Sequence, residues 1–439
     1  MIDILPNIIF SILLITSVGY FIYNIKKLIR VIKLGKPIDR SDNPKKRLYN
    51  MIRIALGQSK MVTKPISGFL HVIVYVGFII INIELLEILI DGVTGSHRFF
   101  SKYFNPNFYN FLIASFEILA FLVLISVILF WTRRNIVKIK RFLSSEMKGW
   151  PKFDADNILY FEVVLMLLFL SMNATDLILQ ERNFEGYYKA GSFPISSFIV
   201  PLFDSFETST VYVFERVFWW LHIIGIFFFL NYLYYSKHLH ILLAFPNTYY
   251  ANLENKGKFG ILESVKNEVL LMFYPEKASQ SNGDVDKFGA SDVLDLNWVQ
   301  LMNAYSCTEC GRCTSECPAN LTGKKLSPRK IMMDTRDRLE KVSKNITINK
   351  GKFVDDGDRL LDNYITKEEL WACTSCNACV EACPINIDPL SIIMDMRQYL
   401  IMEESSAHPD LNNMMNNIEN NGAPWPYNQQ DRELWIQES

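Results

Sequence analysis

The C-terminal third of the chain contains a repeated cysteine pattern, CTECGRCTSECP at residues 307–318 and CTSCNACVEACP at residues 373–384. Each copy has the spacing C-x2-C-x2-C-x3-C-P. Gaps of two residues allow three thiolates of one tight loop to bind one iron–sulfur cube, while the fourth cysteine, which precedes a proline, binds the other cube. Zinc sites take four ligands in two pairs and do not require this spacing. The pattern therefore predicts a helical, loop-rich, ferredoxin-like domain with two [4Fe-4S] clusters.

In this arrangement the two motifs exchange their fourth ligands. The first cluster is expected on Cys307, Cys310, Cys313 and Cys383, and the second on Cys373, Cys376, Cys379 and Cys317. These are all 8 cysteines of the 439-residue chain, and none lies in the first 306 residues. Cysteines confined to one module argue against a disulfide framework and for metal binding in a reducing compartment.

The N-terminal half of the chain is dominated by long apolar segments. Hydrophobic residues make up 50% of the sequence, which includes 31 Phe, and the mean hydropathy is above zero. About 20 consecutive apolar residues span the hydrocarbon core of a bilayer. Five such segments are predicted, at residues 4–23, 66–90, 111–131, 158–179 and 217–235. The first has no basic residue ahead of it and no small-residue cleavage site behind it, so we expect a retained helix rather than a signal peptide.

The loops between these segments differ in charge, although the formal net charge of the chain is only −1. Residues 24–65 carry twelve Lys or Arg against two Asp, and residues 132–157 are again basic. Residues 91–110 and 180–210 carry two Lys or Arg each. Because basic loops stay on the cytoplasmic side, the N-terminus is expected outside a bacterial-type cytoplasmic (inner) membrane. Everything after the fifth segment, including the cysteines, is then expected in the cytoplasm.

The predicted fold class is mainly α, a five-helix transmembrane bundle followed by the cluster domain. The expected division is a membrane domain at residues 1–245, a cytoplasmic linker at 246–295, the cluster domain at 296–400 and a C-terminal tail at 401–439. The polar sequence QSNGD at residues 280–284 predicts a flexible joint ahead of the cluster domain.

Histidines in the apolar segments are candidate haem ligands, because a neutral imidazole nitrogen binds haem iron well. His71 lies near the start of the second segment. His222 and His240 are 18 residues apart, which on one continuous helix places them on one face at depths about 27 Å apart. His238 would point to the opposite face and is the weaker candidate. A lone intramembrane histidine can instead hydrogen-bond a neighbouring helix. The two remaining histidines, His97 and His408, are expected at the surface.

The membrane half resembles the cytochrome b (gamma) subunit of respiratory nitrate reductase, and the related subunits of heterodisulfide reductases. The resemblance is carried by Phe69-Leu70-His71, Leu221-His222 and Ser236-Lys237-His238-Leu239-His240. It implies haem b bound by histidines of the second and fifth helices. Where that family has a second ligand on the second helix, this sequence has Ile81. The resemblance therefore implies one haem on His71 and His240, and a second only if His222 has a partner; pairing of His71 with His222 stays open.

The cluster half resembles the cluster-bearing subunit of heterodisulfide reductase. The matching residues are Phe288-Gly289, Trp298, the segment 307–313 and Leu326-Ser327-Pro328. In related proteins a segment like Asn421-Gly422-Ala423-Pro424-Trp425 leads into a further domain with CCG motifs that holds a catalytic cluster. No cysteine follows Cys383, so such a centre is expected on a partner, a CCG-domain iron–sulfur subunit.

Together the resemblances imply a quinone-linked iron–sulfur oxidoreductase subunit. Electrons would pass between a soluble flavoprotein or dehydrogenase, the two clusters, haem b and a quinone, with menaquinone the expected type. No side chain is expected to act as nucleophile or general base, and no nucleic-acid partner is expected. The intramembrane carboxylates are candidate proton carriers to the quinone, namely Glu84, Glu87, Glu117 and Glu162.

Two other functions fit the same sequence. In the first, quinol drives the reduction of a disulfide or sulfur compound on a partner subunit. In the second, the protein is a membrane redox sensor without net electron flow, which predicts neither haem nor a response to quinone.

Overall fold

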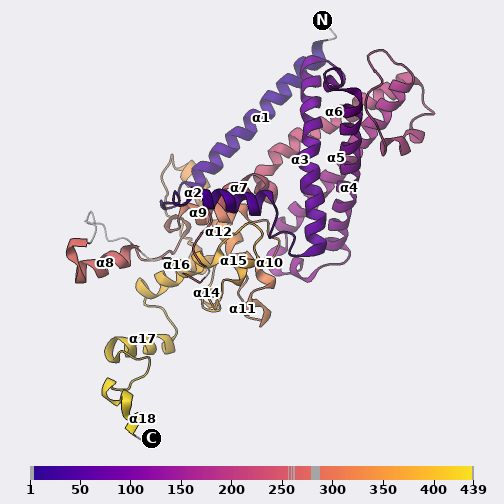
Figure 1. Ribbon diagram of the computed structural model, residues 1–439. Helices are drawn as coiled ribbons and strands as arrows, with labels where there is room; N and C mark the ends of the chain where they lie inside the picture. The colour runs from indigo at the N-terminus through magenta and orange to yellow at the C-terminus, as the bar shows by residue number, and fades with distance from the viewer. Residues whose placement is uncertain (1–3, 256, 259, 261–262, 278–286, 438–439) are drawn as a thin grey trace.

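The computed structural model describes residues 4–255, 257–258, 260, 263–277 and 287–437 (Figure 1). The predicted joint at 280–284 lies outside these residues. The described chain is helical, and its β pairing consists of two isolated bridges, Lys36 with Asn297 and Leu361 with Ile365. The predicted mainly α fold class is confirmed.

In the part of the chain that the structure describes, five helices are long and apolar enough to cross a membrane, which confirms the five predicted segments. They are α1 (Leu5–Ile32), α3 (Pro65–Thr94), α4 (Pro106–Asn135), α5 (Trp150–Glu181) and α6 (Thr208–Tyr232), the last continued by a 3-10 turn at Leu233–Tyr235. Four of them begin with a proline in their first turn, where its fixed φ suits a helix and its missing N–H costs no hydrogen bond. In Figure 1, α3, α4 and α5 stand side by side, and α1 leans toward the cluster domain while it stays in contact with α6.

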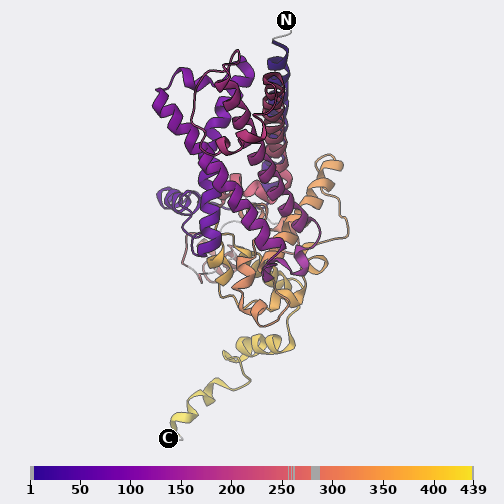
Figure 2. The same cartoon turned by 90° about the vertical axis from the view of Figure 1, so that its right-hand side faces the viewer.

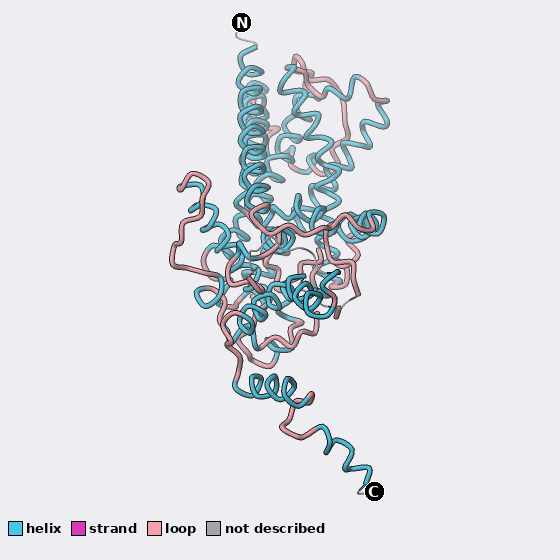
Figure 3. Tube along the Cα trace, turned by 90° about the vertical axis from the view of Figure 1, so that its left-hand side faces the viewer, coloured by secondary structure: helices cyan, strands magenta, loops and turns pink. Residues whose placement is uncertain are grey.

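The cluster domain lies against one end of this bundle, called here the inner end (Figure 2). Most of its helices, apart from α12 and α16, are short, and loops separate them, as Figure 3 shows. They are α9 (Trp298–Ser306), α10 (Arg312–Ser315), α11 (Pro318–Leu321), α12 (Pro328–Ile348), α13 (Leu360–Asn363), α14 (Lys367–Trp371), α15 (Ala378–Ala382) and α16 (Pro389–Met402). Three further helices, α8 (Glu263–Phe273), α17 (Pro409–Asn421) and α18 (Leu434–Gln437), project away from the rest (Figure 1).

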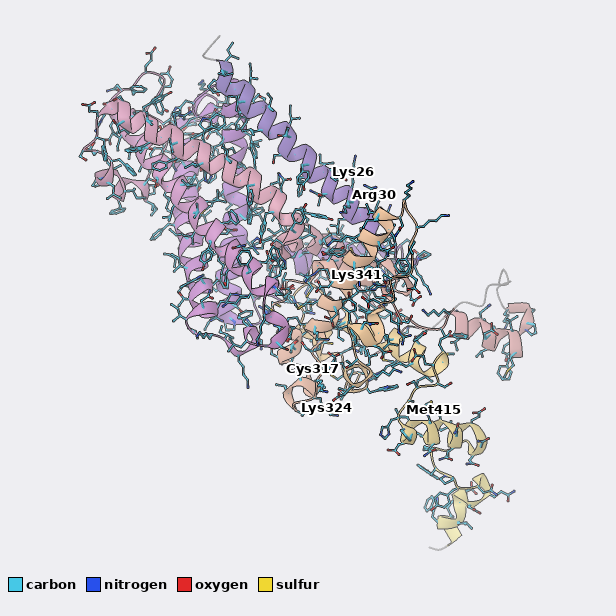
Figure 4. All side chains as sticks on the ribbon, turned by 180° about the vertical axis from the view of Figure 1, so that it is seen from behind. Lys26, Arg30, Cys317, Lys324, Lys341 and Met415 are labelled. Carbon is cyan, nitrogen blue, oxygen red and sulfur yellow. The ribbon has the colours of Figure 1, made fainter. Side chains whose placement is uncertain are left out.

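The core of the cluster domain is built from α9, α12, α16 and the cysteine loops. Figure 4 shows Lys341 of α12 close below Lys26 and Arg30 of α1, with Cys317 and Lys324 on the side farther from α1. Residues 287–295, from the end of the predicted linker, pack onto this core. Ala290 donates a backbone hydrogen bond to the Asp395 carbonyl at 3.0 Å.

The end of α1 is joined directly to the start of α9. Lys36 donates its backbone N–H to the Leu296 carbonyl at 2.8 Å and accepts from Trp298 N–H at 3.2 Å. Gly35 permits this approach, because a Cβ there would lie 2.5 Å from the Trp298 nitrogen. The start of the cluster domain is thus held by backbone hydrogen bonds to the chain that follows the first membrane helix.

The chain between α6 and the cluster domain does not continue as one helix. Ser236 has extended backbone angles, and a second 3-10 turn at Lys237–Leu239 leads into α7 (His240–Tyr249). The argument that His222 and His240 share one face of a continuous helix is therefore wrong. The break redirects the chain, so α7 packs against α9 and α2 (Pro44–Met51) instead of extending α6.

The basic loop between α1 and α3 packs against α7 as well. Arg47 of α2 is fully buried and donates hydrogen bonds to the carbonyls of Tyr249 and Ala251, at 3.2 and 3.0 Å. A π-helical turn, Ile52–Leu56, then leads toward α3. Some of the basic residues of this loop therefore fix its position against α7.

Candidate iron–sulfur and haem sites

Both cysteine motifs fold in the same way. Glu309 and Gly311 have positive φ angles of 56° and 72°, and the equivalent Ser375 and Asn377 have 57° and 59°. Left-handed residues at these two positions turn each loop back on itself, so that its first three thiols face one space. The last cysteine of each motif is extended, as expected of a residue before proline.

The first motif and the last cysteine of the second line one cavity. Its walls include Cys307, Cys310, Cys313 and Cys383, together with Cys379. The thiol of Cys383 is close enough to interact electrostatically with those of Cys310 and Cys313. Without Cys379, the cysteines of this cavity are the four predicted for the first cluster.

The complementary group gathers around the second motif. Cys317 interacts electrostatically with Cys373 and Cys379, and Cys373 also with Cys376. Cys376 is exposed, whereas Cys317 and Cys379 are buried. The two groups of thiols match the predicted ligand exchange, and the ligand assignment stays a prediction.

Backbone amides already point at ligand sulfurs in this structure. Ile387 N–H donates to the sulfur of Cys383 at 3.2 Å, and Ser375 N–H donates to that of Cys373 at 3.4 Å. Hydrogen bonds to thiolate sulfur stabilise a reduced cluster and so tune its potential. The donor set and its surroundings therefore fit two [4Fe-4S] clusters.

Three histidines gather at the inner end of the bundle. His71 of α3 is close enough to His240 for electrostatic interaction, and His238 is close to both, with its ring centroid 5.6 Å from that of His240. The 3-10 turn before α7 brings His238 to this place. Reasoning from a continuous helix missed it, although the sequence SKHLH contains it.

The hydrogen bonds of these rings suit a haem ligand. His240 Nδ1–H donates to the Lys237 carbonyl at 3.0 Å, which leaves Nε2 with the lone pair that binds iron. In the described chain the buried Nδ1 atoms of His71 and His238 have no hydrogen-bond partner. The donor set fits a haem between His71 and His240, and the ligand pairing stays a prediction.

His222 lies apart from this group, within α6. Its Nδ1–H donates to the Leu165 carbonyl of α5 at 3.1 Å, and its ring packs on Phe169. These contacts join α5 to α6 and, as in His240, leave Nε2 free within the described residues. Ile81, at the position where a second ligand could stand, is an aliphatic side chain packed against the bundle core.

Three of the four candidate proton carriers belong to a buried polar network in the outer half of the bundle. Arg98 lies at its centre, with Asp176 at 2.7 Å and Glu84 at 3.8 Å. Glu117 accepts hydrogen bonds from Asn173 and Ser196, and Glu87 accepts from Tyr109 and from Phe100 N–H. Partners of this kind favour a structural role for these three carboxylates. Glu162 stands outside the network.

Hydrogen bonds hold the first cluster loop against the inner end of the bundle. Arg312, between Cys310 and Cys313, donates to the carbonyls of Lys60 and Met61, each at 3.1 Å, and is close enough to interact electrostatically with His71. Asn247 of α7 donates to the Ile385 carbonyl at 2.7 Å. The first cysteine group is therefore the one that faces the histidines.

A buried ion-pair network completes this contact. Lys237 pairs with Glu309, whose other oxygen pairs with Arg336 at 2.8 Å. Burial raises the pKa of Glu309, but the two cations outweigh burial and hold it below its usual value. Burial lowers the pKa of Lys237, and Glu309 opposes that effect. The Glu309 carboxylate and the Lys237 ammonium group therefore stay charged because each is paired with an opposite charge.

Comparisons with known proteins support the cluster domain. Residues 306–387 match the model of the 4Fe-4S dicluster domain family. The chain is 29% identical, over 98% of its length, to the probable iron-sulfur-binding oxidoreductase FadF of Bacillus subtilis, and 25% identical, over 97%, to the EtfAB:quinone oxidoreductase of Syntrophomonas wolfei. It spans 61% and 59% of these two relatives.

A shorter match covers the cluster region. Over 26% of its length, the chain is 29% identical to one subunit of the ferredoxin/F(420)H(2)-dependent CoB-CoM heterodisulfide reductase of Methanosarcina acetivorans, and it covers 56% of that subunit. No solved structure matches the chain. The protein is therefore a membrane protein with a C-terminal 4Fe-4S dicluster domain, similar over nearly its whole length to iron–sulfur oxidoreductases.

Proposed function

We propose that this protein is a membrane-bound electron-transfer subunit that connects a soluble redox partner to the quinone pool. Its path would run through the second cluster, the first cluster and one haem b on His71 and His240. The observation that carries this proposal is the contact of the first cysteine loop with the histidine group, through Arg312 and Lys237. Similarity to a protein named as an EtfAB:quinone oxidoreductase supports the quinone.

The order of the clusters follows from exposure. Cys376 of the second group is exposed, whereas the first group faces the bundle. We place the entry point for a soluble partner at the second group. Similarity to the EtfAB:quinone oxidoreductase supports an electron-transfer flavoprotein as a partner. Similarity to the heterodisulfide reductase subunit supports an iron–sulfur subunit with CCG motifs in the same complex.

When bound, the clusters and the haem would carry one electron at a time. The chain's own residues fix their positions: the paired motifs hold eight thiols, and the Lys237 carbonyl orients His240. Arg312, which is 4% exposed, fills the space between the first loop and the chain that leads into α3. Such packing excludes water and keeps the cofactors at constant separations.

The orientation in the membrane is part of this proposal. The cluster domain contacts the loops before α3 and before α5, and these are the loops rich in Lys and Arg. Basic loops favour the cytoplasmic side. We therefore place the inner end, with the cluster domain, in the cytoplasm and the N-terminus outside the cytoplasmic membrane.

The decisive experiment is a reduced-minus-oxidised spectrum of the purified full-length protein, with iron and haem measured per chain. Two clusters and one haem give about nine iron atoms, of which about eight are not haem iron. A short-chain menaquinol should then reduce the haem without another reductant. Haem-free protein with intact clusters and no response to quinol would contradict the proposal.

A second direction of electron flow is favoured by the similarity to a heterodisulfide reductase. In that case quinol would supply electrons for the reduction of a disulfide on a partner. The direction follows from potentials: clusters with potentials above that of the quinone pool favour this alternative, and clusters with lower potentials favour quinone reduction. Redox titration of the purified protein measures the cluster potentials, which can then be compared with that of the quinone pool.

A further inference from the structure

A cavity of about 480 Å³ lies at the inner end of the bundle, outside the cysteine and histidine groups. Lys27 of α1, Trp150 of α5 and Tyr234 line it on the membrane side, and Tyr305 of α9 and Glu340 of α12 line it on the cluster side. Its size falls within the range of about 300–1,000 Å³ typical of small-molecule sites.

Aromatic side chains form much of the wall. They are Trp150, Tyr232, Tyr234, Tyr235 and Tyr305. Trp150 and Tyr235 are half exposed, at 50% and 51%, and lie at the inner ends of membrane helices. Trp and Tyr at such places lie at the level of the lipid headgroups. A flat ring from the bilayer could therefore enter this cavity and contact aromatic faces.

The polar wall includes hydrogen-bonded groups and tyrosine hydroxyls, beside the charged side chains of Lys27, Arg336, Asp337 and Lys344. On one side Tyr232 donates to Asp154 at 2.6 Å, and Lys237 pairs with Glu309, so these groups are already satisfied. On the other side the hydroxyls of Tyr234 and Tyr305 make no hydrogen bond within the described chain. Both are close enough to Glu340 for electrostatic interaction.

The same cavity adjoins both electron-carrying groups. Glu309, on its wall, lies between Cys307 and Cys310 in the first cluster loop. Lys237, also on its wall, immediately precedes His238. A molecule bound here would therefore contact residues that are neighbours in sequence of both groups.

We propose that this cavity binds the ring of a quinone, with Tyr234 and Tyr305 donating hydrogen bonds to its oxygen atoms and Glu340 delivering protons. The inference rests on the proposed function. Reduction takes two electrons, which the soluble donor supplies one at a time through the cofactors, and two protons from the water side, to give the quinol; oxidation is the reverse. Glu340 is an exposed residue, so its carboxyl group can exchange protons with water.

The test uses the full-length protein with its cofactors and the quinone-site inhibitor 2-heptyl-4-hydroxyquinoline N-oxide, whose fluorescence is quenched on binding. Tyr305→Phe removes one donor and keeps the ring, and should weaken inhibitor binding about tenfold. Glu340→Gln should slow menadiol-driven haem reduction with little change in binding. Tyr188→Phe, at an exposed tyrosine of the outer loop, is the matched control and should behave as wild type.

Two results are decisive against the site. If the wild type binds the inhibitor and menadiol reduces its haem, but both cavity variants behave like Tyr188→Phe, then the quinone site lies elsewhere and the proposed function stands. If the wild type neither binds the inhibitor nor responds to menadiol, the proposed function fails together with the site.

Discussion

The ammonium group of Lys237 pairs with the carboxylate of Glu309 and so joins the turn before His240 to the loop between Cys307 and Cys310. Lys237 also donates to the Pro151 carbonyl at 2.7 Å. The two side chains are 10% and 2% exposed. A buried ion pair costs desolvation, so it contributes little net stability, but leaving one member unpaired is expensive. The pair therefore specifies how the two halves dock.

Replacement of Lys237 tests this docking. Lys237→Met leaves Glu309 with Arg336 alone and should destabilise the protein by about 1–3 kcal/mol. Haem reduction after rapid reduction of the clusters should also be slower. Thermal unfolding and stopped-flow spectroscopy measure the two effects. Lys325→Met, which breaks an exposed pair with Glu368, should change neither, and equal effects in both variants would contradict the role of Lys237.

The histidine assignment predicts a clear division among variants. His71→Ala and His240→Ala should each remove haem b and leave the iron–sulfur signals, because each removes an axial ligand. His222→Ala should keep the haem, since His222 lies within α6, apart from the three histidines at the inner end. The haem content of each purified variant distinguishes these outcomes. Loss of haem from His222→Ala with retention in His240→Ala would favour the other pairing.

The exchange of fourth ligands is tested at Cys317. Cys317→Ser should damage the cluster of the second motif more than that of its own motif, because its thiol interacts with Cys373 and Cys379. Cys383→Ser should show the opposite pattern. Electron paramagnetic resonance of the two reduced centres separates these effects. Damage confined to each residue's own motif would show that the ligands do not cross.

Arg312 should tune the potential of the first cluster. Its positive charge lies within that cluster's loop, and charge of this sign favours the reduced state. Arg312→Met should therefore shift the potential of the first cluster to a more negative value and leave that of the second nearly unchanged. A redox titration followed by spectroscopy measures both. Arg359→Met, at a half-exposed arginine paired with Glu404, is the control.

Gly35 should be required for the contact between α1 and α9. A Cβ at this position would lie 2.5 Å from the Trp298 nitrogen, so Gly35→Ala forces the backbones apart at a cost of about 1–3 kcal/mol. Faster proteolytic release of the cluster domain would show that the contact between α1 and α9 is weakened. Gly19→Ala in α1, where a Cβ meets nothing within 4 Å, should have no such effect. Identical proteolysis of the two variants would contradict the prediction.

Local patterns determined much of this protein from the sequence alone. The five spans were predictable because crossing a bilayer requires an uninterrupted apolar length, which a window of about 20 residues reveals. The two cysteine loops were predictable because spacing within a dozen residues determines which three thiols of one loop can bind the same cube. Both features depend only on residues that are close together in the sequence.

Only the tertiary structure decided how these parts meet. The break at Ser236 turns His238 and His240 toward His71, and a period of 3.6 residues cannot reveal where a helix stops. The side chain of Arg98 gathers carboxylates from separate helices, and Lys237 meets Glu309 across 72 residues. Such contacts arise from the packing of distant segments and the need to neutralise buried charge, and no local pattern in the sequence records them.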